Sequence, residues 1–183
     1  LNGKTTFEGD GRTSSVINQG SLQAALGGYI ALLAPHVRNE GIIVAREGTV
    51  ALAAGDKTTL EFSGNKLVAV IVDRPVMDAL VENKQLVRAE GGYVVLSARS
   101  ANALLSSVIK QSGTIEAPSL VQREGRILLE GGEKGVVSTG GTLSVAGMRE
   151  GTVGGRIVAT GDKVLVTQDA KLDATGQSGG GKI

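Results

Sequence analysis

Short stretches in which apolar and polar residues alternate recur along the chain, and glycines separate them. The fifth and seventh positions of these stretches are aliphatic, and the position between is mostly polar. A period of two is typical of a β-strand with one buried face. The aligned stretches are NQGSLQA from Asn18, NEGIIVA from Asn39, NKQLVRA from Asn83, QSGTIEA from Gln111, TGGTLSV from Thr139 and QDAKLDA from Gln168.

A second alternating stretch follows each of these and begins after a glycine. The position after the glycine suits solvent, and the next position is Ile or Val and suits a core. We therefore predict a second strand in every copy. The introducing glycines are Gly28, Gly48, Gly92, Gly125, Gly155 and Gly181.

The aligned stretches begin 21, 44, 28, 28 and 29 residues apart. A spacing of 44 residues fits two of the shorter units, so residues 58–73 (TTLEFSGNKLVAVIVD) are predicted to form the missing one. A unit this short cannot enclose its own core and must stack on its neighbours. The offsets do not match leucine-rich repeats, and the units are too short for propeller blades. The pattern predicts an all-β protein, a parallel β-helix of about seven turns spaced by ~4.8 Å.

Amide side chains recur at the first position of the aligned stretches. Asn18, Asn39 and Asn83 occupy it, and Gln111 and Gln168 are predicted to share it. Amides stacked at strand spacing can hydrogen-bond along the axis as a ladder. The alternative is that asparagine is present only because it favours turns. Both are structural roles.

Two segments interrupt the repeat with helical apolar spacing, at about 74–83 and 100–110. We interpret them as short helical excursions from a single β-helix segment that spans residues 1–183. They are expected to cover an outward-facing apolar column on the second strands. If that column were bare, it would be a contact site. The column consists of Ala31, Ala51, Val95, Leu128 and Val158.

Composition and charge narrow the classes of partner. Aromatic residues make up 2% of the chain, so the core must be aliphatic. The net charge of +1 argues against nucleic acid as a partner. No apolar run is long enough to span a membrane, and the start of the sequence lacks the layout of a signal peptide. We therefore expect either a protein that is not exported or a mature or excised piece. The absence of cysteine fits a reducing compartment as well as a secreted protein.

Candidate catalytic groups are scattered. Asp56 and Asp162 lie in matching GD corners, where a turn role is favoured over catalysis. His36 has no second histidine or cysteine to join in a metal site or a triad. Phosphate-binding and nucleophile motifs are absent. We therefore expect no enzyme, no catalytic residue, no cofactor and no metal.

One surface column on the second strands combines aromatic and basic groups. Aromatic and basic side chains arranged in a line could bind a glycan or an acidic polymer. The alternative is an ordinary solvated sheet surface. The candidate contact residues are Tyr29, Tyr93, Arg126 and Arg156.

Two linked phrases carry a resemblance to a known family. They are GGYIALLAPHVRNEGIIVAREGTVALAAGDKTTLEFSG from Gly27 and ALVENKQLVRAEGGYVVLSARSANALLSSVIKQSGTIEAPSL from Ala79. From about Asn18 to its end, the chain resembles the filamentous haemagglutinin-like exoproteins of Gram-negative bacteria. This resemblance implies a right-handed parallel β-helix exported by two-partner secretion through an outer-membrane transporter. It also implies a secreted or cell-surface location.

The resemblance further implies adhesion to a host or bacterial receptor or glycan, or a rigid stalk, including one for contact-dependent inhibition. The family's NPNG signatures do not occur here. We therefore expect a section of the rod downstream of the secretion domain. The alternative from another class is a carbohydrate-active β-helix enzyme, which would need carboxylates clustered on adjacent turns.

Overall fold

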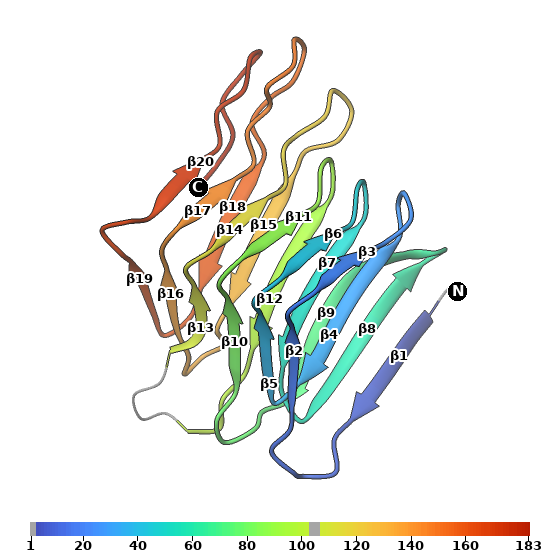
Figure 1. Ribbon diagram of the computed structural model, residues 1–183, viewed down its shortest axis with the longest axis vertical. Helices are drawn as coiled ribbons and strands as arrows, with labels where there is room; N and C mark the ends of the chain where they lie inside the picture. The colour runs from blue at the N-terminus through green and yellow to red at the C-terminus, as the bar shows by residue number, and fades with distance from the viewer. Residues whose placement is uncertain (1–2, 103–106) are drawn as a thin grey trace.

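The computed structural model describes residues 3–102 and 107–183, and within them every regular element is a β-strand. The chain winds into a rod in which each full turn contributes three short strands (Figure 1). Equivalent strands of successive turns pair in parallel and form three sheets along the axis. This architecture is the predicted parallel β-helix. The two long sheets have six strands each, so the described part of the chain forms six turns rather than about seven.

Sheet I, formed by the first strand of each turn, contains β2 (Ser15–Asn18), β5 (His36–Asn39), β10 (Leu80–Asn83), β13 (Ser107–Gln111), β16 (Val136–Thr139) and β19 (Lys163–Val166). Sheet II contains β3 (Ser21–Gln23), β6 (Ile42–Val44), β11 (Leu86–Arg88), β14 (Thr114–Glu116), β17 (Thr142–Ser144) and β20 (Lys171–Asp173). Sheet III contains β4 (Tyr29–Ala34), β7 (Thr49–Ala54), β12 (Tyr93–Ala98), β15 (Arg126–Glu130) and β18 (Arg156–Thr160).

Inward-facing aliphatic side chains from the three sheets form one core along the rod. Ile43 pairs in register with Leu22 on one side and Val87 on the other, and its side chain is fully buried. Ile42, the preceding residue, points outward and is 43% exposed. The alternation read from the sequence therefore places the buried face correctly, because successive strand residues point to opposite faces.

The segment 58–73 does not form a turn of the rod. It belongs to an antiparallel hairpin of β8 (Lys57–Ser63) and β9 (Lys66–Arg74), and β1 (Gly3–Glu8) pairs with β8 to make a three-stranded cover sheet. The cover sheet packs on the outer face of sheet III. Its Leu60, Leu67, Val70 and Val72 form a second apolar cluster with Ala51, Ala53 and Val95. The spacing of 44 residues is thus one turn plus an inserted hairpin.

The helical excursions predicted at 74–83 and 100–110 were wrong where the structure can test them. Residues 74–83 contain the last residue of β9, an isolated bridge at Val76 and strand β10. In the second segment, residues 103–106 lie outside the described residues, Ser100 bridges to Val76, and β13 begins at Ser107. The expected covering of the apolar column is real in part, but the hairpin provides it.

The amide side chains at the end of the sheet I strands form a ladder. Asn18 Nδ2 donates to Asn39 Oδ1, Asn39 Nδ2 to Asn83 Oδ1, and Asn83 Nδ2 to Gln111 Oε1, each at 2.8 Å. These side chains are buried, so the axial bonds replace hydrogen bonds to water. Of the two roles considered for these asparagines, the ladder is therefore present.

The ladder does not extend to Gln168. Thr139 takes the next position after Gln111, and it pairs with Val166 in the last turn, because that turn is two residues longer before sheet II. Gln168 is exposed. The Thr139 hydroxyl is buried without a hydrogen-bond partner among the described residues, so the amide ladder ends at Gln111.

Glycine is required at the corner that leads into sheet III. A Cβ on Gly48 would collide with the carbonyl oxygen of Gly28, and one on Gly92 would collide with the carbonyl oxygen of Gly48. Each of these carbonyls accepts a backbone hydrogen bond from the next turn, Thr49 to Gly28 and Tyr93 to Gly48. The glycines therefore allow a close axial approach at this corner.

Replacing Ile43 with alanine is expected to lower the free energy of unfolding by roughly 2 to 5 kcal/mol, because it leaves a cavity between two turns. The matched variant Ile42→Ala, from the outward-facing neighbour, should cost much less. Denaturant titration of both variants measures the difference. Equal losses would contradict the assigned register.

Asn39→Ala is expected to break the ladder at its centre. The amide of Asn18 and the carbonyl of Asn83 would each lose a buried partner, and each unmet group costs about 1 to 3 kcal/mol. Asn65→Ala, in the exposed turn between β8 and β9, is the control and should leave stability nearly unchanged. Thermal unfolding compares the two variants, and an Asn39→Ala midpoint equal to that of the control would argue against the ladder.

Candidate functional site

The proposed contact residues lie in one register column at the start of the sheet III strands. Tyr29 pairs with Thr49, Thr49 with Tyr93, Tyr93 with Arg126, and Arg126 with Arg156. The shared repeat position expected from the sequence is therefore correct.

The cover sheet divides this column into two parts. Tyr29 packs against Phe62 of β8, with ring centroids 5.3 Å apart and an interplanar angle of 58°. Thr49 is buried, and its hydroxyl donates to the carbonyl oxygen of Leu67 in β9 at 2.9 Å. The covered Thr49 thus separates Tyr29 from Tyr93. The two tyrosines do not form one continuous aromatic surface.

Tyr93 and Arg126 form the centre of the second part. The Arg126 guanidinium carbon lies 5.5 Å from the centroid of the Tyr93 ring, within cation–π range. Burial raises the pKa of Tyr93 from 10.0 to about 12, and the positive charge of Arg126 opposes this shift. The phenol is therefore neutral at physiological pH, and one face of its ring is occupied by the guanidinium group.

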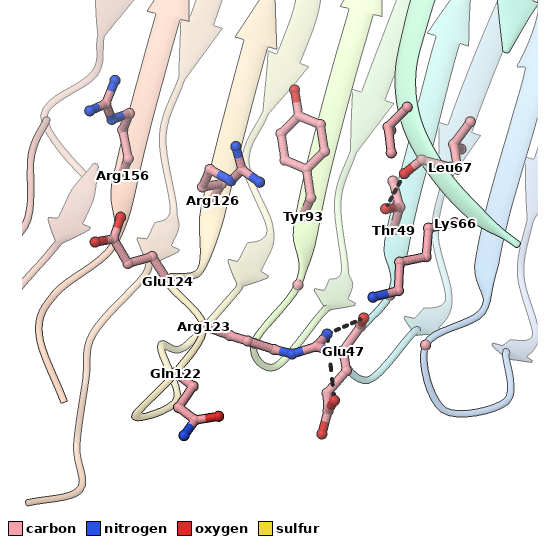
Figure 2. A pocket seen from close by; sticks show the side chains of 15 residues that line it. Glu47, Thr49, Lys66, Leu67, Tyr93, Gln122, Arg123, Glu124, Arg126 and Arg156 are labelled. Carbon is pink, nitrogen blue, oxygen red and sulfur yellow. Dashed lines mark hydrogen bonds and ion pairs between the residues drawn. The ribbon is translucent and has the colours of Figure 1, made fainter. Parts of the chain in front are cut away.

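A groove of about 770 Å³ opens beside this pair, between the first residues of β9 and the corner loops (Figure 2). Four cationic side chains and two carboxylates line it, so its lining carries a net positive charge while the whole chain carries only +1. The charged lining residues are Lys66, Arg123, Arg126, Arg156, Glu47 and Glu124.

One wall of the groove is fixed by a strained corner. Glu47 has a φ of 53°, and it is the one non-glycine residue with positive φ in the described part of the chain. Arg123 Nη1 donates to the Glu47 carbonyl oxygen at 3.3 Å and lies 3.5 Å from its carboxylate. Because Arg123 is engaged in this way, the cations of the groove that remain for a ligand are Lys66, Arg126 and Arg156.

The polar residues considered for catalysis do not gather at this groove. His36 begins strand β5 in sheet I. Asp56 accepts from Arg74 Nε at 2.6 Å and holds the end of the cover sheet, and the Asp162 backbone amide donates to Gly135 at a corner. Among the described residues, no group of three or more His, Cys, Asp or Glu side chains is placed to hold a metal ion.

Sequence reasoning missed the contribution of the cover sheet to this site. Lys66, Leu67 and Val68 come from β9, and this segment was expected to form part of a turn of the rod. The signal that could have shown this is Ser63–Gly64–Asn65–Lys66, a turn sequence between two alternating stretches, which is typical of a hairpin. Arg123, on a corner loop, carries no comparable sequence signal.

The fold and the site together define a β-solenoid protein with a surface groove lined by charged side chains. The model of the TPS secretion domain family matches residues 2–145. The chain belongs to this family and is part of a two-partner secretion exoprotein. This finding corrects the expectation that the chain lies downstream of the secretion domain, because most of it matches that domain itself.

A solved structure supports the same assignment. The crystal structure of the HMW1 secretion domain from Haemophilus influenzae matches with a TM-score of 0.80 and 26% sequence identity. The match covers 94% of this chain and 44% of that chain, so this chain spans less than half of the length of the HMW1 structure. No curated protein matches the sequence. In the described part of the chain, no helix is long and apolar enough to cross a membrane.

The altered pKa of Tyr93 predicts a titration that absorbance can follow. In a Tyr29→Phe variant, where Tyr93 is the one remaining tyrosine, phenolate should form with a midpoint near 12. Because the folded-state pKa is raised, this contribution to stability is complete below pH 10 and is lost as the pH rises toward 12. In strong denaturant the midpoint should return to about 10. A native midpoint near 10 would show that the ring is solvated.

Proposed function

We propose that this chain is the part of an exoprotein that an outer-membrane two-partner secretion transporter recognises, and that the exoprotein is delivered to the cell surface or the medium. The observation that carries this proposal is the match of residues 2–145 to the TPS secretion domain. The fold supports it, because stacked turns expose long, regular outer faces that a transporter can contact. The family is not a family of enzymes, and we do not propose a carbohydrate-active enzyme.

The rod also supports a second role as a rigid stalk. Its turns are joined by continuous parallel pairing along the axis, with a buried core and an amide ladder, so bending would break bonds in several sheets at once. A stalk holds a distal activity at a fixed distance. Adhesion to a cell-surface receptor is supported by the exposed Arg126 and Arg156 in the candidate column.

A secretion assay tests the export role. The parent exoprotein is co-expressed with its transporter in a Gram-negative host, with or without residues 2–145. The proposal predicts that deletion removes the exoprotein from the medium and leaves it in the periplasm. A deletion of equal length elsewhere in the parent rod is the control and should still be secreted. Normal secretion after loss of residues 2–145 would contradict the proposal.

A further inference from the structure

The cover sheet ends at β9 with an open edge. Its strand order is β1–β8–β9, and among the described residues β9 pairs with β8 alone. A strand at a sheet edge presents unpaired backbone N–H and C=O groups, which can pair with another extended chain. Because β9 contacts β7 and β12 of sheet III, its open edge lies toward β15, where the cover is incomplete.

Beyond β9, the cover over sheet III is incomplete. The outward apolar column is buried at Ala51 and Val95, where β9 packs on it, but Leu128 of β15 and Val158 of β18 are only partly buried. A strand paired with β9 would lie about 4.8 Å further along the rod. It would rest on the outer face of β15 and bury these two side chains. The surface beside β9 could therefore accommodate one further strand.

Charged side chains are distributed unevenly along the surface beside β9, with cations at one end and a carboxylate at the other. At its beginning stand Lys66, Arg126 and Arg156, and in the described part of the chain none of them has a carboxylate at ion-pair distance. Figure 2 shows Arg126 and Arg156 projecting from successive strands beside Tyr93, across the groove from Lys66. At its far end lies Glu130, which accepts a hydrogen bond from Ser97 at 3.3 Å. A strand bound beside β9 would therefore carry acidic residues at the end that lies near Lys66, Arg126 and Arg156.

We propose that the open edge of β9 and the adjacent groove bind an extended acidic peptide segment of a partner protein by strand addition. Backbone hydrogen bonds to β9 would supply affinity. Apolar side chains on one face would cover Leu128 and Val158, and carboxylates at one end would meet Arg126 and Arg156. This inference goes beyond the export role and does not depend on it.

The arrangement favours a peptide over a glycan. Sugar rings bind by stacking on free aromatic faces, but Arg126 occupies one face of Tyr93 and Phe62 packs against Tyr29. A glycan would also leave the open backbone edge of β9 unpaired. Both the edge and the guanidinium groups are satisfied by one extended acidic peptide.

Fluorescence anisotropy with the 183-residue chain tests the proposal. The probes are labelled octapeptides with two glutamates at one end and alternating valine and threonine after them, made in both chain directions. Saturable binding of one direction is expected. The double variant Arg126→Gln/Arg156→Gln should bind at least about tenfold more weakly, because two charge-assisted contacts are lost. The control Lys110→Gln/Lys163→Gln removes the same charge from sheet I and should bind normally.

Two further measurements separate strand addition from simple charge attraction. Peptides in which every second backbone amide is N-methylated, in both frames, should lose binding in the frame that faces β9. Hydrogen exchange should slow at residues 66–72 when the unmodified peptide is added. Undiminished binding of both methylated peptides, equal weakening by the control variant, or the absence of saturable binding would each overturn the proposal.

Discussion

Every turn of this protein depends on the turn beside it, because a single turn cannot bury its own aliphatic side chains. Ile43 is fully buried only because Leu22 and Val87 lie above and below it in register. The axial hydrogen bonds follow the same rule. An asparagine amide buried in the rod finds its partner in the next turn at 2.8 Å, and it would otherwise be an unmet polar group. Stacking thus sets both the core and the polar interior.

The cover sheet is the main departure from this regularity, and it creates the surface features of the molecule. It buries the outer face of β7, so that strand is buried on both faces and all six of its residues are buried. Where the cover stops, the open edge of β9, the partly buried Leu128 and the basic groove come together. The inserted hairpin therefore turns a uniform rod into one with a distinct binding surface.

The repeat pattern predicted the rod well because each of its signals is local. The alternation in NEGIIVA identified Ile43 as inward-facing. The recurrence of Asn18, Asn39 and Asn83 left a ladder and a turn role as alternatives, and the structure shows the ladder. The hairpin was missed because its own alternation has the same period of two as the rod strands. Nothing in the period distinguishes a strand that pairs in parallel with the next turn from one that folds back on its neighbour.

The candidate site was only partly predictable for a similar reason. The column of Tyr29, Tyr93, Arg126 and Arg156 follows from the repeat, and the structure confirms its register. The separation of the two tyrosines depends on the hydrogen bond between Thr49 and Leu67, which are 18 residues apart. Contacts made by an insertion are set by tertiary packing, and a repeat alignment contains no information about them.

The exchange of the ladder side-chain amides with solvent, measured by NMR, tests the stacked interior most directly. The account predicts that the side-chain amide protons of Asn18, Asn39 and Asn83 exchange far more slowly than those of exposed Asn65, and that cross-peaks connect each ladder amide to the next. Exchange of Asn39 and Asn83 at the rate of Asn65 would show that these amides meet water rather than one another, and would contradict the stacking on which the fold depends.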